Sequence, residues 1–189
     1  MKQSCDALII GGSAGSLEVL LTILPLLRED LAFPVIVVLH RKAGKDQLLT
    51  DLLKTKTHLL VKELEEKETI EPATIYIAPP NYHVLIEKDH SFSLDASEKV
   101  NFSRPSIDVT FESAADVYGK NLVCLLLSGS NNDGSFGLQK VKEQGGRAII
   151  QDPDTADVPF MPQNAADTVA IDQILTIDEM AGYINQLNK

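Results

Sequence analysis

Short apolar runs alternate along this chain with segments of helical periodicity, and this alternation is the feature that most restricts its fold. The runs "DALIIG" (6–11), "FPVIVVLH" (33–40) and "NLVCLLLSG" (121–129) have the length and near-complete apolarity of strands buried on both faces of a sheet. Parallel strands need crossover connections, which the intervening helical segments can supply. The sequence therefore predicts an α/β fold with three layers around a mostly parallel, doubly wound sheet.

The helices are predicted from their apolar spacing and from residues that start or stop a helix. Four leucines after the first strand fall on one helical face: Leu17, Leu20, Leu21 and Leu24. Pro25 then ends or kinks that helix. Ser106 and Gly119 bound a later helix, and "TIDE" (176–179) is a capping box that opens a terminal helix. Two further helices are expected at 45–55 and 135–146.

The remaining strands include a hairpin that leaves the main sheet. Segments 82–87 and 91–96 alternate apolar and polar residues around a short polar turn, which is typical of a β-hairpin. Further strands are expected at 59–64 and from residue 74 to a double proline, and "RAIIQ" (147–151) is predicted as the last strand. The complete prediction is one domain over residues 1–189 with a β-hairpin excursion.

Charge and composition argue against several classes of function. The 189 residues carry a formal net charge of −10, without the basic stripe that nucleic-acid binding needs. The amino terminus lacks a signal peptide's apolar core, and no apolar run reaches membrane-spanning length. Cys5 and Cys124 lie in or beside apolar runs, so we expect buried, reduced thiols. These features predict a cytoplasmic protein that neither binds nucleic acid nor inserts into a membrane.

Three chemically useful side chains follow three different apolar runs. Ser13 follows the first strand, His40 ends the second, and Asp133 follows the run "LVCLLL". In open α/β sheets, ligands bind beyond the carboxyl ends of the strands. A serine hydroxyl needs a base to take its proton, an imidazole can act as that base, and a carboxylate can orient the imidazole. The pattern fits a Ser-His-Asp hydrolase if the fold brings these three residues together.

Each of these residues also has an ordinary structural explanation. A serine in a glycine turn can cap a helix, a strand-end histidine can be a hydrogen-bonded structural residue, and Asp-Gly is a common turn. A glycine turn can also hold a phosphate, but Ile10 stands where a dinucleotide fingerprint needs glycine. His40 replaces the acidic residue that would hold a ribose. A phosphate-loop nucleotidase is excluded because no G-K-[ST] follows the turn.

The turn matches one further pattern, the G-x-S-x-G nucleophile elbow. Gly11, Ser13 and Gly15 occupy its fixed positions. The α/β-hydrolases place their histidine late, after the acidic residue, whereas the last histidine here is His90. Any triad in this chain therefore has the order Ser, His, Asp and differs from that of an ordinary α/β-hydrolase.

No metal or cofactor site is expected from the remaining polar clusters. Asp152, Asp154 and Asp157 lie in "QDPDTAD", but this segment lacks the glycine and terminal glutamate of a calcium loop. His58 lies in a polar connection and His83 in the hairpin, where structural or exposed side chains are expected.

Six segments occur in one order over about residues 6 to 187. They are "IGGSAGS", "VVLHR", "IYIAPPNYHVLIE", "RPSIDVTFESAA", "LLLSGSNNDGSFGLQKVKEQGG" and "QDPDTADVPFMPQNAA". Together they resemble the catalytic domain of the bacterial chemotaxis protein-glutamate methylesterases (CheB type). That family is a serine hydrolase with a Ser-His-Asp triad on a parallel α/β sheet. The matching positions here are Ser13, His40 and Asp133.

The resemblance implies hydrolysis of glutamate γ-methyl esters on the cytoplasmic helices of chemoreceptors, with release of methanol. Many members also deamidate receptor glutamines. Ser13 would attack the ester carbonyl, His40 would accept and return the proton, and Asp133 would hold the imidazole. The backbone amide of Ala14, at the amino end of a helix, is the expected oxyanion donor. Three more residues are expected around the site: Gly12, Ser130 and Met161.

The chain departs from the family's usual residues near this site. Ala14 replaces a common threonine, and Ser16 replaces a second glycine. The other departures are Leu39 and Arg41 beside the histidine, Ser130 and Asn131 before the aspartate, and Phe160 before Met161. Because several of these residues surround the expected site, they leave the substrate preference open.

Three functional hypotheses follow, with a nucleotide-binding module as a distant fourth. The main one is an active methylesterase acting on chemoreceptors or a related protein substrate. The alternatives are a serine esterase or amidase with another substrate, and a non-catalytic scaffold homologue. The first strand begins by about Asp6, so the chain is expected to lack the receiver domain that controls the best-known members. The sequence predicts no oligomeric state.

Overall fold

A seven-stranded parallel sheet forms the centre of the protein. The computed structural model describes residues 4–40 and 47–188. The strands of the sheet are β1 (Ala7–Gly12), β2 (Val35–Leu39), β3 (Leu60–Glu63), β4 (Thr74–Ile77), β7 (Leu122–Leu126), β8 (Arg147–Gln151) and β9 (Gln173–Leu175). Their spatial order is β3-β4-β2-β1-β7-β8-β9, and each neighbouring pair is parallel.

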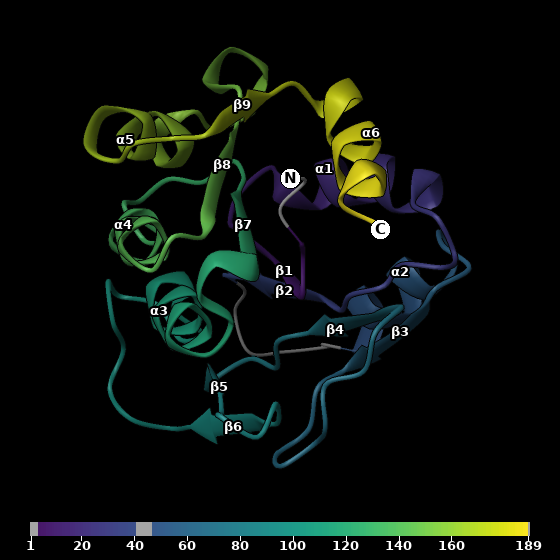
Figure 1. Ribbon diagram of the computed structural model, residues 1–189. Helices are drawn as coiled ribbons and strands as arrows, with labels where there is room; N and C mark the ends of the chain where they lie inside the picture. The colour runs from purple at the N-terminus through teal and green to yellow at the C-terminus, as the bar shows by residue number, and fades with distance from the viewer. Residues whose placement is uncertain (1–3, 41–46, 189) are drawn as a thin grey trace.

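Helices cover both faces of this sheet, as Figure 1 shows. One layer contains α1 (Ser16–Ile23), α2 (Gln47–Lys54) and α6 (Ile177–Leu187). The other contains α3 (Ile107–Tyr118), α4 (Ser135–Glu143) and α5 (Phe160–Thr168). Leu8 and Ile10 of β1 pack into the first core, whereas Ala7 and Ile9 pack into the second, because successive strand residues face opposite sides. The predicted three-layer, doubly wound α/β fold is confirmed.

The central strand β1 lies where the winding of the chain reverses. It pairs with β2 on one side and β7 on the other. The chain leaves β1 for α1 in one layer and leaves β7 for α4 in the opposite layer. The diverging connections open a crevice at the carboxyl ends of these strands. Residues that directly follow β1, β2 and β7 are therefore neighbours in space.

The buried face of the first helix coincides only in part with the predicted leucine face, since Leu20 and Leu24 are fully buried. Its buried residues are Ser16, Val19, Leu20 and Ile23. Leu17 is 36% exposed and Leu21 is only partly buried, which contradicts part of the prediction. The helix is apolar on several sides, and its rotation is fixed by Ser16, whose hydroxyl donates to the carbonyl of Ser128 at 2.7 Å. Pro25 does end the helix, in a 3₁₀ turn at Leu24–Leu26.

The predicted boundaries of two later helices are confirmed. α3 lies between Ser106 and Gly119, and α6 begins after Thr176 with a complete capping box to Glu179. The hydroxyl of Ser106 does not cap α3, however. It donates to Asp133 at 2.9 Å, and Asp133 itself accepts the first N–H groups of that helix.

The hairpin is also confirmed, whereas two elements near the carboxyl end were not predicted. β5 (His83–Ile86) and β6 (Phe92–Asp95) pair antiparallel and pack in the α3 layer, beside α3 in Figure 1. β9 follows β8, so the prediction that 147–151 is the last strand is wrong. β9 has only three residues and lies at the sheet edge, and α5 contains a proline and has little apolar periodicity.

Both cysteines are buried thiols, as predicted. Within residues 4–40 and 47–188, no helix combines the length and apolarity that a bilayer crossing requires.

Candidate active site

The carboxyl ends of the central strands bring His40 and Asp133 into direct contact. Ser13 directly follows β1, His40 directly follows β2, and Asp133 lies in the turn between β7 and α4. Nε2 of His40 lies 2.7 Å from Oδ2 of Asp133. The His40 side chain is 11% exposed, and the Asp133 side chain is fully buried. A buried carboxylate at this distance orients the ring and places a proton on Nε2.

The carboxylate of Asp133 is held at the amino end of α3. Four groups donate to it in addition to His40: Ile107 N–H (2.7 Å), Asp108 N–H (3.0 Å), the Ser106 hydroxyl (2.9 Å) and Asn101 Nδ2 (3.1 Å). Burial acts to raise the pKa of Asp133, but these donors outweigh burial and lower the pKa below its ordinary value. Asp133 is therefore ionised at neutral pH.

Asp108 is a second buried carboxylate beside Asp133. It is 4% exposed, and its Oδ1 accepts the N–H groups of Gly134 at 2.9 Å and Gly137 at 2.7 Å, at the start of α4. Its Oδ2 accepts a hydrogen bond from Asn101 Nδ2 at 2.7 Å. Burial, reinforced by the negative charge of Asp133, raises the pKa of Asp108 to about 7. The two carboxylates thus have opposite pKa shifts.

The second ring nitrogen of His40 faces a turn of the loop between β6 and α3. Nδ1 lies 3.4 Å from the hydroxyl oxygen of Ser103. Within the described part of the chain, no hydrogen bond joins the Ser13 hydroxyl to either nitrogen of His40. The fold therefore places Ser13 at the neighbouring strand end without a direct bond to the imidazole.

Ser13 opens a tight turn between β1 and α1. Its N–H donates to the carbonyl of Ser128 at 2.9 Å and to the hydroxyl of Ser16 at 3.1 Å. Gly15 has φ of 83°, a left-handed conformation that favours glycine. Gly12 is the last residue of β1, and a Cβ there would overlap the Ser16 hydroxyl. Gly15 thus allows the left-handed backbone of the turn, and Gly12 leaves room for the Ser16 side chain.

Met161 and Gly129 form one wall beside Ser13. Met161 is fully buried, and its N–H donates to the carbonyl of Gly129 at 3.0 Å. A Cβ on Gly129 would lie 2.5 Å from Met161 Cε and 3.1 Å from Ser13 Cβ. The predicted neighbour Met161 therefore packs on a residue that itself touches Ser13.

Two exposed backbone segments flank the Ser13 turn. Ala14 follows Ser13 directly, and Ser130 follows Gly129. The N–H groups of Ala14 and Ser130 have no hydrogen-bond acceptor among the residues that the structure describes. The carbonyl of Ala14 accepts the hydroxyl of Ser128 at 2.6 Å, which anchors the turn. Both N–H groups can therefore donate to a new acceptor, such as an oxyanion.

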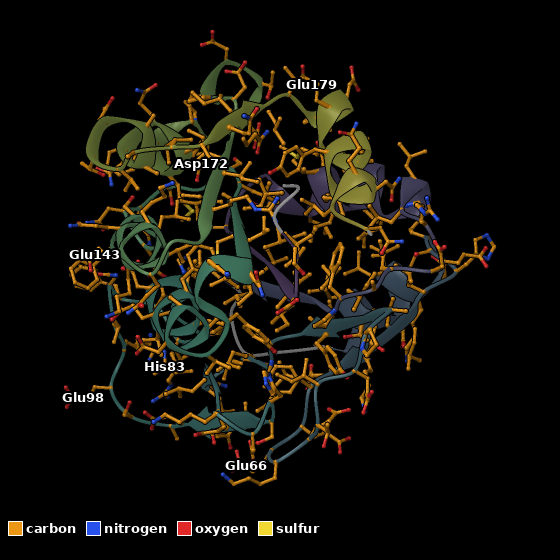
Figure 2. The ribbon with its side chains drawn as sticks, viewed as in Figure 1. Glu66, His83, Glu98, Glu143, Asp172 and Glu179 are labelled. Atoms are coloured by element: carbon orange, nitrogen blue, oxygen red, sulfur yellow. The ribbon has the colours of Figure 1, made fainter. Side chains whose placement is uncertain are left out.

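His83 and His58 make no direct contact with the His40–Asp133 pair. His83 is 1% exposed: Nδ1 accepts the N–H of Ser106 at 3.1 Å, and Nε2 donates to the carbonyl of Glu98 at 2.9 Å. His83 and Glu98 are labelled in Figure 2, at the hairpin and in the loop that leads to α3. The side chain of His58 is 82% exposed.

The aspartates of "QDPDTAD" have structural contacts. Asp152 accepts the N–H of Asp154 at 3.0 Å. Asp157 packs against Gly15: a Cβ added to Gly15 would lie 2.7 Å from the Cβ of Asp157. Among the described residues, no three His, Cys, Asp or Glu side chains gather as a metal site would require.

The residues that depart from the family pattern lie at different depths. Asn131 accepts the N–H of Asp133 at 3.1 Å, so it shapes the turn that carries the carboxylate. Phe160 is 55% exposed. Arg41 lies outside the described residues.

Three polar residues of this region were not identified from the sequence. They are Asn101, Asp108 and Ser128. Asp108 stands between the apolar residues Ile107 and Val109, but an acidic residue in the first turn of a helix is common, so its burial carried no clear local signal. Asn101 and Ser128 act through contacts with residues distant in sequence, which no local pattern indicates.

The three-layer α/β fold, with the buried His40–Asp133 pair at the carboxyl ends of its strands, matches the catalytic domain of a hydrolase. A sequence model of the CheB methylesterase family matches residues 8–184. The chain belongs to the CheB methylesterase family.

Relatives and a solved structure extend this similarity over almost the whole chain. A Leptospira interrogans (serovar copenhageni) protein, provisionally named protein-glutamate methylesterase/protein-glutamine glutaminase, is 44% identical over 97% of this chain and 95% of its own length. The Thermotoga maritima protein-glutamate methylesterase/protein-glutamine glutaminase is 34% identical over 88% of this chain and 49% of its own length. The crystal structure of the Thermotoga maritima CheB methylesterase catalytic domain matches with a TM-score of 0.93 and 32% identity, covering 97% of this chain and 99% of that one.

Proposed function

We propose that this protein hydrolyses γ-methyl esters of glutamate side chains on a protein substrate, with Ser13 as nucleophile. The observation that carries this proposal is the 2.7 Å contact between Nε2 of His40 and Asp133, one strand away from the Ser13 turn. Family membership supports the same reaction, since its relatives carry the methylesterase name.

The protonation of the His40 ring gives its two nitrogens different roles. Nε2 carries the proton shared with Asp133, so the neutral ring has an unprotonated Nδ1. Nδ1 is then the atom that accepts the proton of Ser13. Ser103 lies 3.4 Å from Nδ1, a long contact that a rotated Ser13 hydroxyl can replace when the substrate binds.

The reaction follows from these positions. Ser13 Oγ bonds to the ester carbonyl carbon as its proton moves to Nδ1 of His40. The tetrahedral oxyanion accepts the N–H groups of Ala14 and Ser130, a term worth about 3–4 kcal/mol per donor in comparable sites. Collapse breaks the bond to methoxide, which leaves as methanol with the proton from His40. Water, deprotonated by His40, then releases the glutamate carboxylate and restores Ser13.

Glutamine deamidation uses the same steps with ammonia as the leaving group. The printed names of the relatives include protein-glutamine glutaminase, so we include this activity in the proposal. We further propose that the substrates are the cytoplasmic helices of chemoreceptors and that the residues assigned here act without a metal or cofactor.

The proposal is tested by incubating the protein with methylated chemoreceptor and measuring methanol. Ser13→Ala should reduce release by at least about 10³-fold, because the nucleophile is lost while the fold is retained. A fluorophosphonate should label Ser13 in the wild type, and His40→Ala should suppress the labelling. Methanol release that survives Ser13→Ala contradicts the assigned mechanism.

A second candidate function is a serine esterase or amidase with a different substrate. Two observations favour it: Ala14 has no side-chain hydroxyl beside the nucleophile, and Phe160 is exposed next to Met161. Hydrolysis of p-nitrophenyl acetate by Ser13, without methanol release from receptors, would select this candidate. Absence of both labelling and hydrolysis would select a non-catalytic scaffold.

A further inference from the structure

Asn101 is the side chain that contacts both buried carboxylates. Its Nδ2 lies 2.7 Å from Oδ2 of Asp108 and 3.1 Å from Oδ1 of Asp133. An amide nitrogen carries two hydrogens, so one group can satisfy both acceptors at once. Two carboxylates that share a buried site resist double ionisation, and donors between them reduce this resistance.

The backbone holds Asn101 in place before any substrate binds. Val100 and Ser103 form a reciprocal pair of backbone hydrogen bonds, and Asn101 has φ of 51° within this turn. Asparagine tolerates this left-handed conformation better than most residues. Arg104 donates to the carbonyl of Ala96 at 2.7 Å, and His83 donates to that of Glu98, so the loop is tied at several points.

The same turn contacts the imidazole. Ser103, two residues after Asn101, lies 3.4 Å from Nδ1 of His40. One four-residue turn therefore contacts both members of the His40–Asp133 pair. Asn101 and Asp108 also line a cleft of about 580 Å³ between α3, α4 and α5, which gives solvent a route to Asp108.

We propose that Asn101 is a positioning residue for the Ser13 reaction, which it serves by holding Asp133 ionised and directed at His40. This inference rests on the proposed function, because it concerns the same reaction. Asn101 acts in two ways: it donates to Asp133 directly, and it occupies the oxygen of Asp108 that otherwise competes for a shared proton. Without it, a proton held between Asp108 and Asp133 weakens the acceptor that His40 needs.

Two substitutions separate this role from a structural one. Asn101→Gly keeps the left-handed turn and removes the amide. Asn101→Asp keeps the shape and replaces the donor with a third carboxylate. The matched control is Asn132→Ala, since Asn132 is exposed and directly precedes Asp133 in the chain.

The decisive measurement is the pH profile of fluorophosphonate labelling at Ser13, together with kcat/KM on the methylated receptor. Asn101→Gly should shift the low-pH limb of the rate profile to higher pH by about one unit. On that limb the rate at a given pH should fall about tenfold, whereas at high pH it should approach the wild-type rate. Asn101→Asp should lose more at high pH, where the added carboxyl is charged. Asn132→Ala should match the wild type. An unchanged profile in Asn101→Gly, or an equal loss at every pH, would overturn the proposal.

A second measurement keeps the inference separate from the proposed function. If the wild type shows no Ser13-dependent chemistry, the proposed function fails, and carboxyl ¹³C NMR titration still tests Asn101. Asn101→Gly should then move the titration of the Asp108–Asp133 pair to higher pH. A titration identical to that of the wild type would show that Asn101 does not control the ionisation of the pair.

Discussion

Asp133 and Asp108 each bind the amino end of the other's helix. Asp133, in the turn before α4, accepts the N–H groups of Ile107 and Asp108 at the start of α3. Asp108, in the first turn of α3, accepts the N–H groups of Gly134 and Gly137 at the start of α4. Helix amino ends favour negative charge, so each carboxylate stabilises the partner helix while the two repel each other.

The raised pKa of Asp108 predicts a specific pH dependence of stability. From about pH 4 to about pH 7 the folded protein keeps a proton on Asp108 that the unfolded chain releases, so this group's contribution to stability falls as pH rises through that range. The fall is on the order of 2–3 kcal/mol between pH 5 and pH 8. Asp133 has a lowered pKa, so its contribution to stability is present at pH above the ordinary pKa of an aspartate and is lost as pH falls below it.

Asp108→Asn should therefore gain stability relative to the wild type as pH rises, because it has no proton to release. Chemical unfolding at about pH 5 and about pH 8 measures the difference. Asp116→Asn, an exposed site on the same helix, serves as control. Parallel stability curves for Asp108→Asn and the wild type would contradict the assignment.

Asp133→Asn tests the link between the carboxylate and the imidazole. The amide no longer fixes the charge or tautomer of His40, and comparable triads then lose on the order of 10⁴-fold in kcat. Donors at the start of α3 also lose their charged partner, so unfolding free energy should fall by about 1–3 kcal/mol. Because the residues act as a unit, the double variant with Ser13→Ala should be little slower than Ser13→Ala alone.

Gly129→Ala should disturb Ser13 by steric overlap. The new methyl would lie 2.5 Å from Met161 Cε and 3.1 Å from Ser13 Cβ, so we expect a loss of about 1–3 kcal/mol and a lower kcat. Gly182→Ala in α6 is the control: no atom lies within 4 Å of its Cβ, and stability should rise by about 0.5–1 kcal/mol. Equal effects at the two glycines would refute the packing argument.

Ser128→Ala should loosen the nucleophile turn from a distance. The Ser128 hydroxyl donates to the carbonyl of Ala14 at 2.6 Å and accepts the N–H of Val158 at 2.9 Å, which ties the turn to the segment before α5. We expect roughly a tenfold to hundredfold loss in kcat with a smaller change in KM, because the reacting atoms lose alignment. Ser135→Ala removes another buried serine hydroxyl, bonded to Asn164, and should leave kcat near the wild-type value. Similar kinetics for the two variants would argue against a role for the Ser128 tether.

Much of the fold could be predicted from local patterns, and the failures have physical causes. Apolar runs predicted the strands near the centre of the sheet because those strands are buried on both faces. β9 was missed because an edge strand of three residues, two of them exposed, carries little apolar pattern. The buried face of α1 was predicted only in part because apolar residues surround the helix, and the contact from Ser16 to Ser128 selects its rotation.

The sequence by itself determined which chemically useful side chains follow the buried strands: a serine, a histidine and an aspartate, each at the end of an apolar run. Only the tertiary structure decided that His40 uses Nε2 toward Asp133, and that Asp108 and Asn101 share the site. The ends of these strands can be predicted from the local sequence, because a strand buried on both faces is a run of apolar residues and ends where that run ends. Ionisation states cannot be predicted in this way, because the pKa of a carboxylate depends on burial and on donors from distant segments. His40, for example, lies 93 positions before Asp133 in the chain, and only folding brings the two together.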